Sequence, residues 1–165
     1  YPVVARPQAM WPRYNPGGLV KKKYKITIDR AAIDKYSEHY FEEHPRAYVP
    51  PIKQPYHESI NKWMIMRRPA MNALKQKWKG FITWYVEILG YSALRIHKYE
   101  MIQTIYYPEN PRRDPNNSTP KFILDGLVEG GMLGDDDGVS MQSLTLKCRY
   151  DKDNPRTEIE IKILE

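Results

Sequence analysis

The second half of the chain contains the pattern that most constrains the fold, which is one short helix placed between two polar turns. Residues 96–107 are rich in β-branched and aromatic side chains, and this composition predicts a central strand. The strand leads into a polar turn at 112–117, a short apolar helix follows, and an acidic turn at 131–137 comes next. We expect the carboxylates of the two turns to lie together at one end of the helix. Such a group of acids suits a hard divalent cation beside a phosphate backbone.

The remaining segments complete an α+β pattern. Residues 24–28 predict a short strand, and Asp29 is placed to cap the helix that follows. Residues 69–89 have the strongest helical period of the chain. Two more strands are expected at 139–150 and 157–164, and the last has one polar face because its isoleucines alternate with charged residues. We therefore expect a single domain with a mixed β-sheet and helices packed on one face.

Length and composition indicate how the chain is organised. A chain of 165 residues can bury a substantial core without a disulfide or a structural metal. Residues 1–23 are rich in proline, glycine and basic residues, so we expect a basic arm ahead of a domain that spans 24–165. The Pro-rich segment 44–58 predicts a loop or clamp. The single cysteine, Cys148, fits a reducing compartment and no apolar run could span a membrane, so we expect a cytoplasmic protein with no membrane partner.

Charge is distributed unevenly along the chain. Residues 1–113 hold 20 Lys and Arg against 9 Asp and Glu, whereas residues 114–165 hold 6 against 11. A basic body beside a compact acidic cluster suits a nuclease, because cations gather phosphates while acids hold metal. A solvated basic surface on a protein with an unrelated partner is the alternative explanation of the charge alone.

The helix predicted at 69–89 has an apolar stripe and a basic face. Its aromatic residues follow the helical period, so we expect them to face the core rather than to stack on bases. The basic side chains in and before the helix lie off this stripe and are expected to be free to meet DNA. Those assigned to DNA contact are Arg67, Arg68, Lys75 and Lys79.

The short helix between the two turns has recognisable ends. Ser118 or Thr119 can cap it, Pro120 stands at its start, and a Gly-Gly pair ends it. Its N-terminus has free backbone amides and the positive end of the helix dipole. We therefore expect this N-terminus to point towards the turn at 112–117.

Three motifs occur in a fixed order around this helix. Arg-Arg-Asp-Pro-x-Asn begins at Arg112, Lys-Phe-Ile-Leu-Asp-Gly-Leu begins at Lys121, and Gly-x-Leu-x-Asp-Asp-Asp begins at Gly131. Together they resemble the RusA family of crossover-junction (Holliday junction) endodeoxyribonucleases, carried mostly by bacteriophages and prophages, and in particular members from Gram-positive hosts. The resemblance covers about residues 56–165 and implies a RusA-like α+β fold.

The resemblance also implies an activity and its residues. The family consists of homodimers that bind branched DNA and resolve four-way junctions by symmetric phosphodiester hydrolysis with Mg²⁺ or Mn²⁺, in recombination and repair. Asp114 matches the first catalytic aspartate, and Asp136 matches the later one. Lys121 matches the lysine at the helix start, where a cation stabilises negative charge on the scissile phosphate. The implied metal ligands are Asp114, Asn116, Asn117, Asp135 and Asp136, and Asp125 is a further weak ligand or a residue that supports them.

One position departs from the family pattern. Many members carry an aspartate where this chain has Asn116, and the neutral amide removes one negative charge from the metal site. Arg112 and Arg113 either clamp phosphates or act as counter-charges for Asp114, and we favour phosphate contact. A non-catalytic module that binds junction DNA or RNA, as part of a larger assembly, is the alternative function.

The same residues have other possible explanations. Asp137 and Gly138 form a favourable turn pair, so a solvated acidic hairpin is the alternative to a metal site at this position. A calcium-binding loop is rejected, because Leu133 and Leu144 would occupy its first and twelfth positions. The four histidines show no paired metal spacing and are expected to be surface residues or polar residues of the core.

Overall fold

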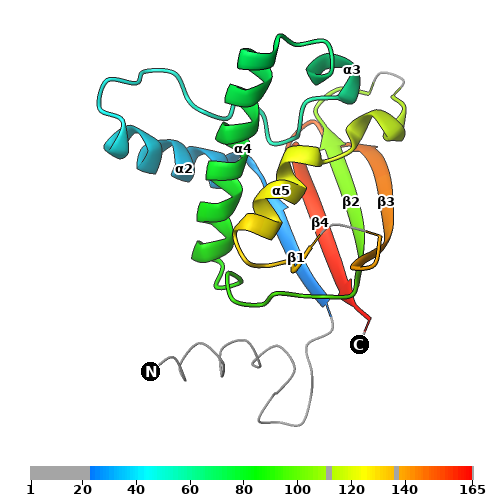
Figure 1. Cartoon of the computed structure of the whole chain (residues 1–165). Helices are drawn as coiled ribbons and strands as arrows, with labels where there is room; N and C mark the ends of the chain where they lie inside the picture. Colours follow the sequence, from blue (N-terminus) through cyan, green and yellow to red (C-terminus); the bar gives the residue numbers. More distant parts are fainter. Residues whose placement is uncertain (1–22, 111–112, 136–137, 165) are drawn as a thin grey trace, which may run out of the picture.

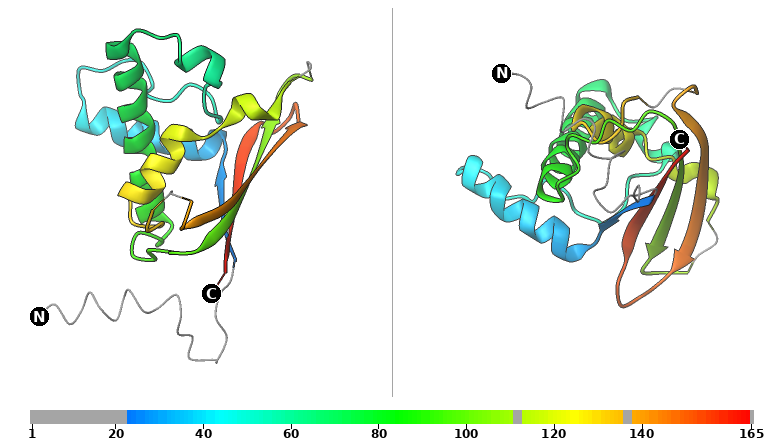
Figure 2. Two further views of the ribbon diagram at one scale, coloured as in Figure 1. Left: turned by 45° about the vertical axis from the view of Figure 1, so that its right-hand side comes forward. Right: turned by 90° about the horizontal axis from the view of Figure 1, so that it is seen from below.

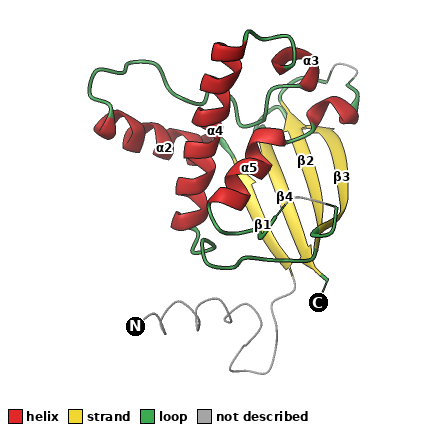
Figure 3. Cartoon of the chain, viewed as in Figure 1, coloured by secondary structure: helices red, strands yellow, loops and turns green. Residues whose placement is uncertain are grey.

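The computed structural model describes residues 23–110, 113–135 and 138–164. These residues form an α+β fold with one four-stranded mixed sheet and helices on one of its faces (Figures 1 and 3). The elements in chain order are β1 (Lys23–Ile28), α2 (Arg30–Glu43), α3 (Ile60–Trp63), α4 (Arg68–Ile88), β2 (Tyr99–Tyr107), the 3₁₀ helix η2 (Pro115–Ser118), α5 (Lys121–Glu129), β3 (Met141–Tyr150) and β4 (Arg156–Ile163). The expected arm lies outside the described residues except for Lys23, which begins β1.

The four strands lie in the order β1, β4, β2, β3. β4 pairs antiparallel with both β1 and β2, whereas β3 pairs parallel with β2. The strand expected from residues 96–107 is therefore central, and the mixed sheet is confirmed. β3 and β4 follow each other in sequence, yet β2 lies between them, so the loop that joins them crosses the end of the sheet.

Alternate residues of the sheet face the helices and form the core. In β2, every second residue from Tyr99 to Tyr107 is buried, and the residues between them are partly exposed. β4 continues the layer with Ile159 and Ile161, both fully buried. The strict alternation follows from the pleat of a strand, which turns successive side chains to opposite faces.

The aromatic stripe of α4 packs onto this layer, as predicted. Trp78, Phe81, Ile82 and Val86 are buried in the core. Ile88, at the end of the stripe, is instead 53% exposed, because the helix ends there and leaves the core. α4 is the longest helix of the described chain, and none of the described helices has the length and apolar composition needed to cross a membrane.

α2 begins where the sequence predicts. Asp29 has an extended backbone, and its side chain accepts a hydrogen bond from the Ala32 amide at 2.9 Å, which satisfies one of the free amides of the first turn. Ala32, Ile33 and Tyr36 form the buried side of the helix. The N-cap prediction is therefore confirmed.

The Pro-rich segment between α2 and α3 contains no helix or strand and is held against the sheet. The buried Thr157 hydroxyl of β4 donates a hydrogen bond of 2.6 Å to the carbonyl of Pro55. The Arg30 side chain of α2 donates to the carbonyl of Lys53 at 2.9 Å. The segment is therefore an anchored loop, as its proline content suggests.

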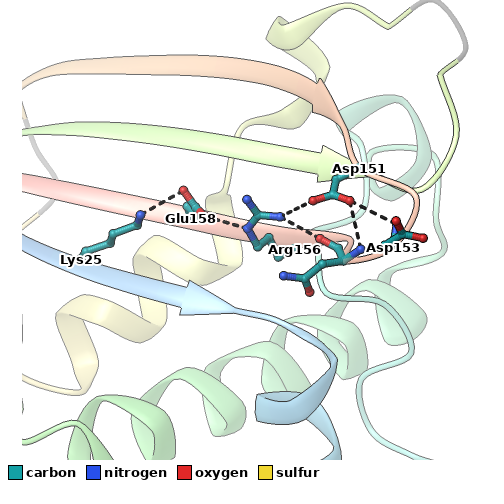
Figure 4. A network of polar contacts seen from close by, with 6 residues as sticks. Lys25, Asp151, Asp153, Arg156 and Glu158 are labelled. Carbon is teal, nitrogen blue, oxygen red and sulfur yellow. Dashed lines mark hydrogen bonds and ion pairs between the residues drawn. The ribbon is translucent and has the colours of Figure 1, made fainter.

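None of the described helices covers the second face of the sheet (Figure 2), which carries a network of charged side chains (Figure 4). Arg156 donates to Glu158 at 2.7 Å and to Asp151 at 2.9 Å, and its guanidinium lies 3.8 Å from the ring centroid of Tyr106. Lys25 pairs with Glu158 at 3.2 Å. Burial acts to raise the pKa of Glu158, but the hydrogen bonds from Arg156 and Lys25 outweigh it and lower that pKa. The cations of this network are therefore engaged with acids of the same face.

α4 and α5 approach each other closely at Gly126. A Cβ atom at this position would lie 2.6 Å from Cβ of Ile82 and 2.8 Å from its Cγ2. Both atoms are close to the backbone of α4, so a small side chain shift cannot relieve the overlap. Only glycine permits this helix-to-helix distance.

We therefore expect Gly126→Ala to destabilise the protein. The overlap with Ile82 costs about 1–3 kcal/mol, and the better helix propensity of alanine returns up to about 1 kcal/mol, so a net loss of about 1–2 kcal/mol is expected. Urea unfolding measures the effect. Gly138→Ala is the matched control, because a Cβ there meets no atom within 4 Å. Equal midpoints for the two variants would contradict the close packing of α4 and α5.

Candidate functional site

Asp114 lies in the turn that follows β2. Its Oδ1 accepts a hydrogen bond from the Asn116 amide at 3.0 Å, and its carbonyl accepts one from the Asn117 amide at 3.0 Å. These bonds form η2, a single turn of 3₁₀ helix that begins with Pro115. Asp114 and Asn116 are exposed and Asn117 is partly exposed. The turn therefore presents a fixed, solvent-accessible carboxylate at the end of the central strand.

A buried glutamine of β2 holds this turn in place. Gln103 is fully buried on the helix-facing side of the strand, and its Nε2 donates to the Ser118 carbonyl at 2.8 Å. Ser118 in turn donates from Oγ to the Pro115 carbonyl at 2.6 Å. Gln103 was not among the residues predicted from the sequence, although a polar residue in the apolar half of an alternating strand is a recognisable signal of a buried hydrogen bond.

The N-terminus of α5 is capped by a residue from a distant segment. The buried His57 accepts a hydrogen bond at Nε2 from the Phe122 amide at 3.0 Å. Since Nε2 is the acceptor, the proton is on Nδ1, which donates to the carbonyl of Glu58 at 2.7 Å. The expectation that Ser118 or Thr119 caps this helix is therefore wrong, because their hydroxyls donate backwards to carbonyls of η2.

His57 also gives the fold a pH dependence. Burial lowers the pKa of His57, so the folded protein holds the neutral ring at pH values where the unfolded chain already binds a proton. The stability that the neutral His57 ring contributes is fully present above pH 6.5, the ordinary histidine pKa, and is lost progressively as the pH falls from that value towards the lowered pKa. We expect a slope of up to about 1.4 kcal/mol per pH unit between roughly pH 6.5 and the lowered pKa.

This slope is measured by urea unfolding of the wild type and of His57→Gln at pH values of roughly 7.5, 6.5 and 5.5, which cover the interval in which histidine titrates. The variant is expected to be less stable at the highest pH but to lose less stability on acidification. His97→Gln, at an exposed position, is the matched control and keeps the wild-type slope. The same slope in all three proteins would show that His57 is not the titrating group.

Lys121 is the first residue of α5 and is exposed. Its ammonium lies 3.9 Å from the carboxylate of Asp125, one helical turn on, and the two side chains are 53% and 21% exposed. A pair of this length and exposure holds the lysine weakly. Lys121 thus remains available to an anion at the N-terminus of α5, the helix that follows η2 and Asp114 in the chain.

The basic side chains assigned to DNA contact fall into two groups. Arg67 and Arg68 are exposed around the N-terminus of α4, and Lys75 is partly exposed further along the helix. Lys79 is different, because it pairs with Glu129 of α5 at 3.0 Å and is only 19% exposed. The expectation that Lys79 is free to meet DNA is therefore wrong, since the packing of α5 on α4 gives it an acidic partner.

Arg113 lies beside the Asp114 turn and stacks on an aromatic ring. Its guanidinium is 3.8 Å from the ring centroid of Tyr107, the last residue of β2. Tyr56, from the Pro-rich segment, packs edge-on against the same ring with centroids 4.8 Å apart. Stacking fixes the guanidinium plane and leaves its N–H groups able to bind phosphate. Arg112 lies outside the described residues.

The two acidic turns lie at opposite ends of the sheet. Asp114 follows the C-terminal end of β2, whereas the carbonyl of Asp135 accepts a hydrogen bond of 2.6 Å from the hydroxyl of Tyr99, the first residue of β2. Nine residues of strand separate the two ends, a distance of roughly 26 Å. The expectation that both turns meet at one end of the helix is therefore wrong for Asp135.

The parallel pairing of β2 and β3 explains this separation. β3 starts beside Tyr99 and ends beside Tyr107, so α5 must carry the chain back to the beginning of the sheet before β3 can start. The turn after β2 and the turn before β3 are consequently at opposite ends. Asp136, the second predicted catalytic aspartate, lies outside the described residues.

No cluster of metal-ligating side chains is found among the described residues. Across 23–110, 113–135 and 138–164, no three His, Cys, Asp or Glu side chains lie close enough together to hold one. Asp114 is adjacent to the amide residues Asn116 and Asn117, but Asp135 is at the other end of the sheet.

No protein-family model matches this chain, and a search of curated proteins finds no match. The RusA assignment therefore stays a prediction that rests on the sequence motifs.

Proposed function

We propose that this protein is a metal-dependent, structure-specific endonuclease that resolves four-way DNA junctions by symmetric phosphodiester hydrolysis, in recombination and repair. One observation carries the proposal. The exposed carboxylate of Asp114 and the exposed ammonium of Lys121 lie on successive turns, η2 and the start of α5. The stacked guanidinium of Arg113 is beside them. A carboxylate with cations beside it suits a reaction in which negative charge develops on a phosphate.

The surroundings favour nucleic acid at the same end of the molecule. α3 contacts η2, and Figure 1 shows α3 and the first turn of α4 at the end of the sheet where β2 finishes. The exposed Arg67 and Arg68 stand at the start of α4. These cations can bind the backbone on either side of the reacting phosphate. The open face of the sheet is a poorer candidate, because Lys25 and Arg156 are already paired with acids there.

The proposed roles follow from these positions. Asp114 is the proposed catalytic and metal-binding carboxylate, and Lys121 is proposed to stabilise the charge on the phosphate. Arg113, Arg67, Arg68 and Lys75 are proposed to hold the DNA backbone. The proposed cofactor is Mg²⁺ or Mn²⁺ and the proposed assembly a homodimer, although the described part of a single chain does not assemble a metal site.

A second function is favoured by two specific observations. The separation of Asp114 from Asp135 and the neutral Asn116 both weaken a metal site within one chain. A non-catalytic module that binds junction DNA or RNA would need the cations of α4 and the Arg113 guanidinium before η2 but no assembled acids. The two functions predict the same binding and differ in cleavage.

Cleavage of a labelled four-way junction, beside a linear duplex of equal length, separates the two functions. Each substrate is incubated with Mg²⁺, Mn²⁺ or EDTA, and the wild type is compared with Asp136→Asn. Metal-dependent, symmetric cutting of the junction alone, lost in the variant, supports the endonuclease. Tight binding of the junction in a gel-shift assay without cutting in either metal supports the binding module, and Asn116→Asp then tests whether the missing charge is the cause.

A further inference from the structure

A pocket of about 380 Å³ lies between the Pro-rich segment, α3 and the first half of α4. Its lining is largely apolar, since Ile52 and Trp78 are almost fully buried and Leu74 is partly buried. The volume of this space, the α4 pocket, is within the range of roughly 300–1,000 Å³ that is typical of ligand sites. The α4 pocket is therefore large enough to hold apolar side chains of another molecule.

The apolar lining of the α4 pocket continues to the protein surface. Val49 lines it and is 48% exposed, and the neighbouring Tyr48 is 89% exposed. On the α4 side, Ala70 and Ala73 are exposed and three residues apart, so they share one face of the helix. Their short side chains allow another chain to come close to the helix backbone. An apolar partner would thus remove surface from water on both sides of the pocket.

Cations accompany this apolar lining. Lys53 of the Pro-rich segment, Lys62 of α3 and Lys77 of α4 line the pocket, and all three are exposed. The ion pairs of the described residues involve none of these lysines. The one acid among the described lining residues, Glu58, accepts a hydrogen bond of 3.0 Å from the indole N–H of Trp78. The ammonium groups therefore favour an anionic occupant.

Nucleic acid matches this combination of surfaces less well than an acidic peptide does. A base stacks on an exposed aromatic ring, and the one aromatic ring among the described lining residues, that of Trp78, is only 1% exposed. A phosphate group would pair with the lysines but would leave the apolar lining in water. A peptide that carries both carboxylates and apolar side chains meets both requirements.

We propose that the α4 pocket binds an acidic segment of a partner protein. Apolar side chains of the segment pack against Ile52, Leu74 and Ala73, while its carboxylates pair with the three exposed lysines. A few apolar anchors then provide most of the affinity, and the charges set the choice of partner and the rate of association. This recruitment of a protein is a function beyond the proposed cleavage of DNA and does not depend on it.

The pocket and the cations assigned to DNA are on different sides of α4. Lys77 and Lys75 are two residues apart, so they project from nearly opposite sides of the helix. Arg68 is seven residues before Lys75 and therefore shares its side. A peptide in the α4 pocket thus leaves Lys75 and Arg68 accessible, and the protein can hold a partner and a phosphate backbone at the same time.

Selection from a random peptide library displayed on phage, with the full chain as the bait, tests the chemistry of the occupant. The expected result is enrichment of peptides that combine Asp or Glu with apolar residues. The enriched peptides are then synthesised with a fluorescent label, and their affinity for the wild type is measured by fluorescence anisotropy. Enrichment of basic or uncharged peptides, or of no peptide, overturns the proposal.

Two variants test whether the peptide binds in the α4 pocket. Ala73→Trp fills the pocket without a change of charge, and Lys62→Glu combined with Lys77→Glu reverses the charge beside it. Each is expected to weaken binding of the selected peptide by at least about tenfold. All three positions are exposed, so the circular dichroism should stay that of the wild type, and either variant is sufficient if the other fails to fold. Wild-type affinity in a folded variant contradicts binding in the pocket.

Lys75→Glu is the matched control, because it reverses a charge on the other side of α4. Peptide affinity is expected to stay at the wild-type value in about 0.15 M salt, where exposed charges are screened beyond about 8 Å. A lower affinity, similar to that of the pocket variants, would show that overall charge and not the pocket binds the peptide.

Competition with an unlabelled four-way junction distinguishes a peptide site from a nucleic-acid site. The labelled peptide is expected to stay bound when the junction is added, and Ala73→Trp is expected to bind the junction as the wild type does. Displacement of the peptide, or weaker junction binding by Ala73→Trp, would assign the pocket to nucleic acid and overturn the proposal. A protein that binds the peptide but neither binds nor cuts the junction refutes the proposed function and leaves this inference intact.

Discussion

Asp114→Asn is expected to lower the rate of junction cleavage by at least about 100-fold, while the affinity for the junction changes little. Asparagine keeps the shape of the side chain and an oxygen that can accept the Asn116 amide, so η2 and the surrounding fold are retained. What it removes is the negative charge. The loss of cleavage at unchanged stability would therefore report on chemistry and not on folding.

Single-turnover cleavage of a labelled four-way junction measures this effect, and a gel-shift assay in EDTA measures binding. Asp34→Asn is the matched control, because Asp34 is an exposed aspartate of α2 whose nearest cation, Arg30, lies at 3.9 Å. The control should cut at the wild-type rate. Wild-type cleavage by Asp114→Asn would remove Asp114 from the site and leave the proposed mechanism without its central carboxylate.

His57→Ala is expected to have the largest effect on stability, a loss of about 3–4 kcal/mol. The ring is 2% exposed and packs between Trp78 and Phe122, with centroid distances of 5.7 and 4.8 Å. Its removal leaves a cavity beside two aromatic rings and leaves the Phe122 amide without its acceptor. Both losses occur at the helix N-terminus that carries Lys121, so the site loses order together with the fold.

Urea or thermal unfolding of His57→Ala beside His97→Ala measures this effect. His97 is an exposed residue before β2, and its replacement should cost less than about 0.5 kcal/mol. Hydrogen exchange of the Phe122 amide gives a second, local reading, since it should become faster in the His57 variant than in the control. Equal stabilities of the two variants would show that α5 does not depend on this cap.

The cap at α5 illustrates how far local sequence signals reach. Ser118 and Thr119 have the right chemistry for an N-cap and stand just before the helix, so the sequence favours them. In the structure their hydroxyls close η2, and the cap comes from His57, which is 65 residues away along the chain. Local capping rules identify a suitable residue type. They take no account of an acceptor from another part of the chain, such as His57, that tertiary packing brings to the helix N-terminus.

The sequence by itself determined most of the elements of this protein, but not α3 or η2. Alternation of period two located β2 and β4, the helical stripe located α4 and its buried face, and Asp29 marked the start of α2. These signals are reliable because the pleat, the helical turn and the first free amides act on residues that are close in sequence. The sequence also placed Asp114 at the end of the central strand.

Only the tertiary structure decided which of these elements meet. The placement of β2 between β4 and β3, and the parallel direction of β3, separate the two acidic turns by the length of the sheet. The packing of α5 on α4 gives Lys79 its partner Glu129. Strand order, strand direction and helix contact depend on partners far apart in the chain, so no local pattern could specify them, and they govern which predicted site residues can act together.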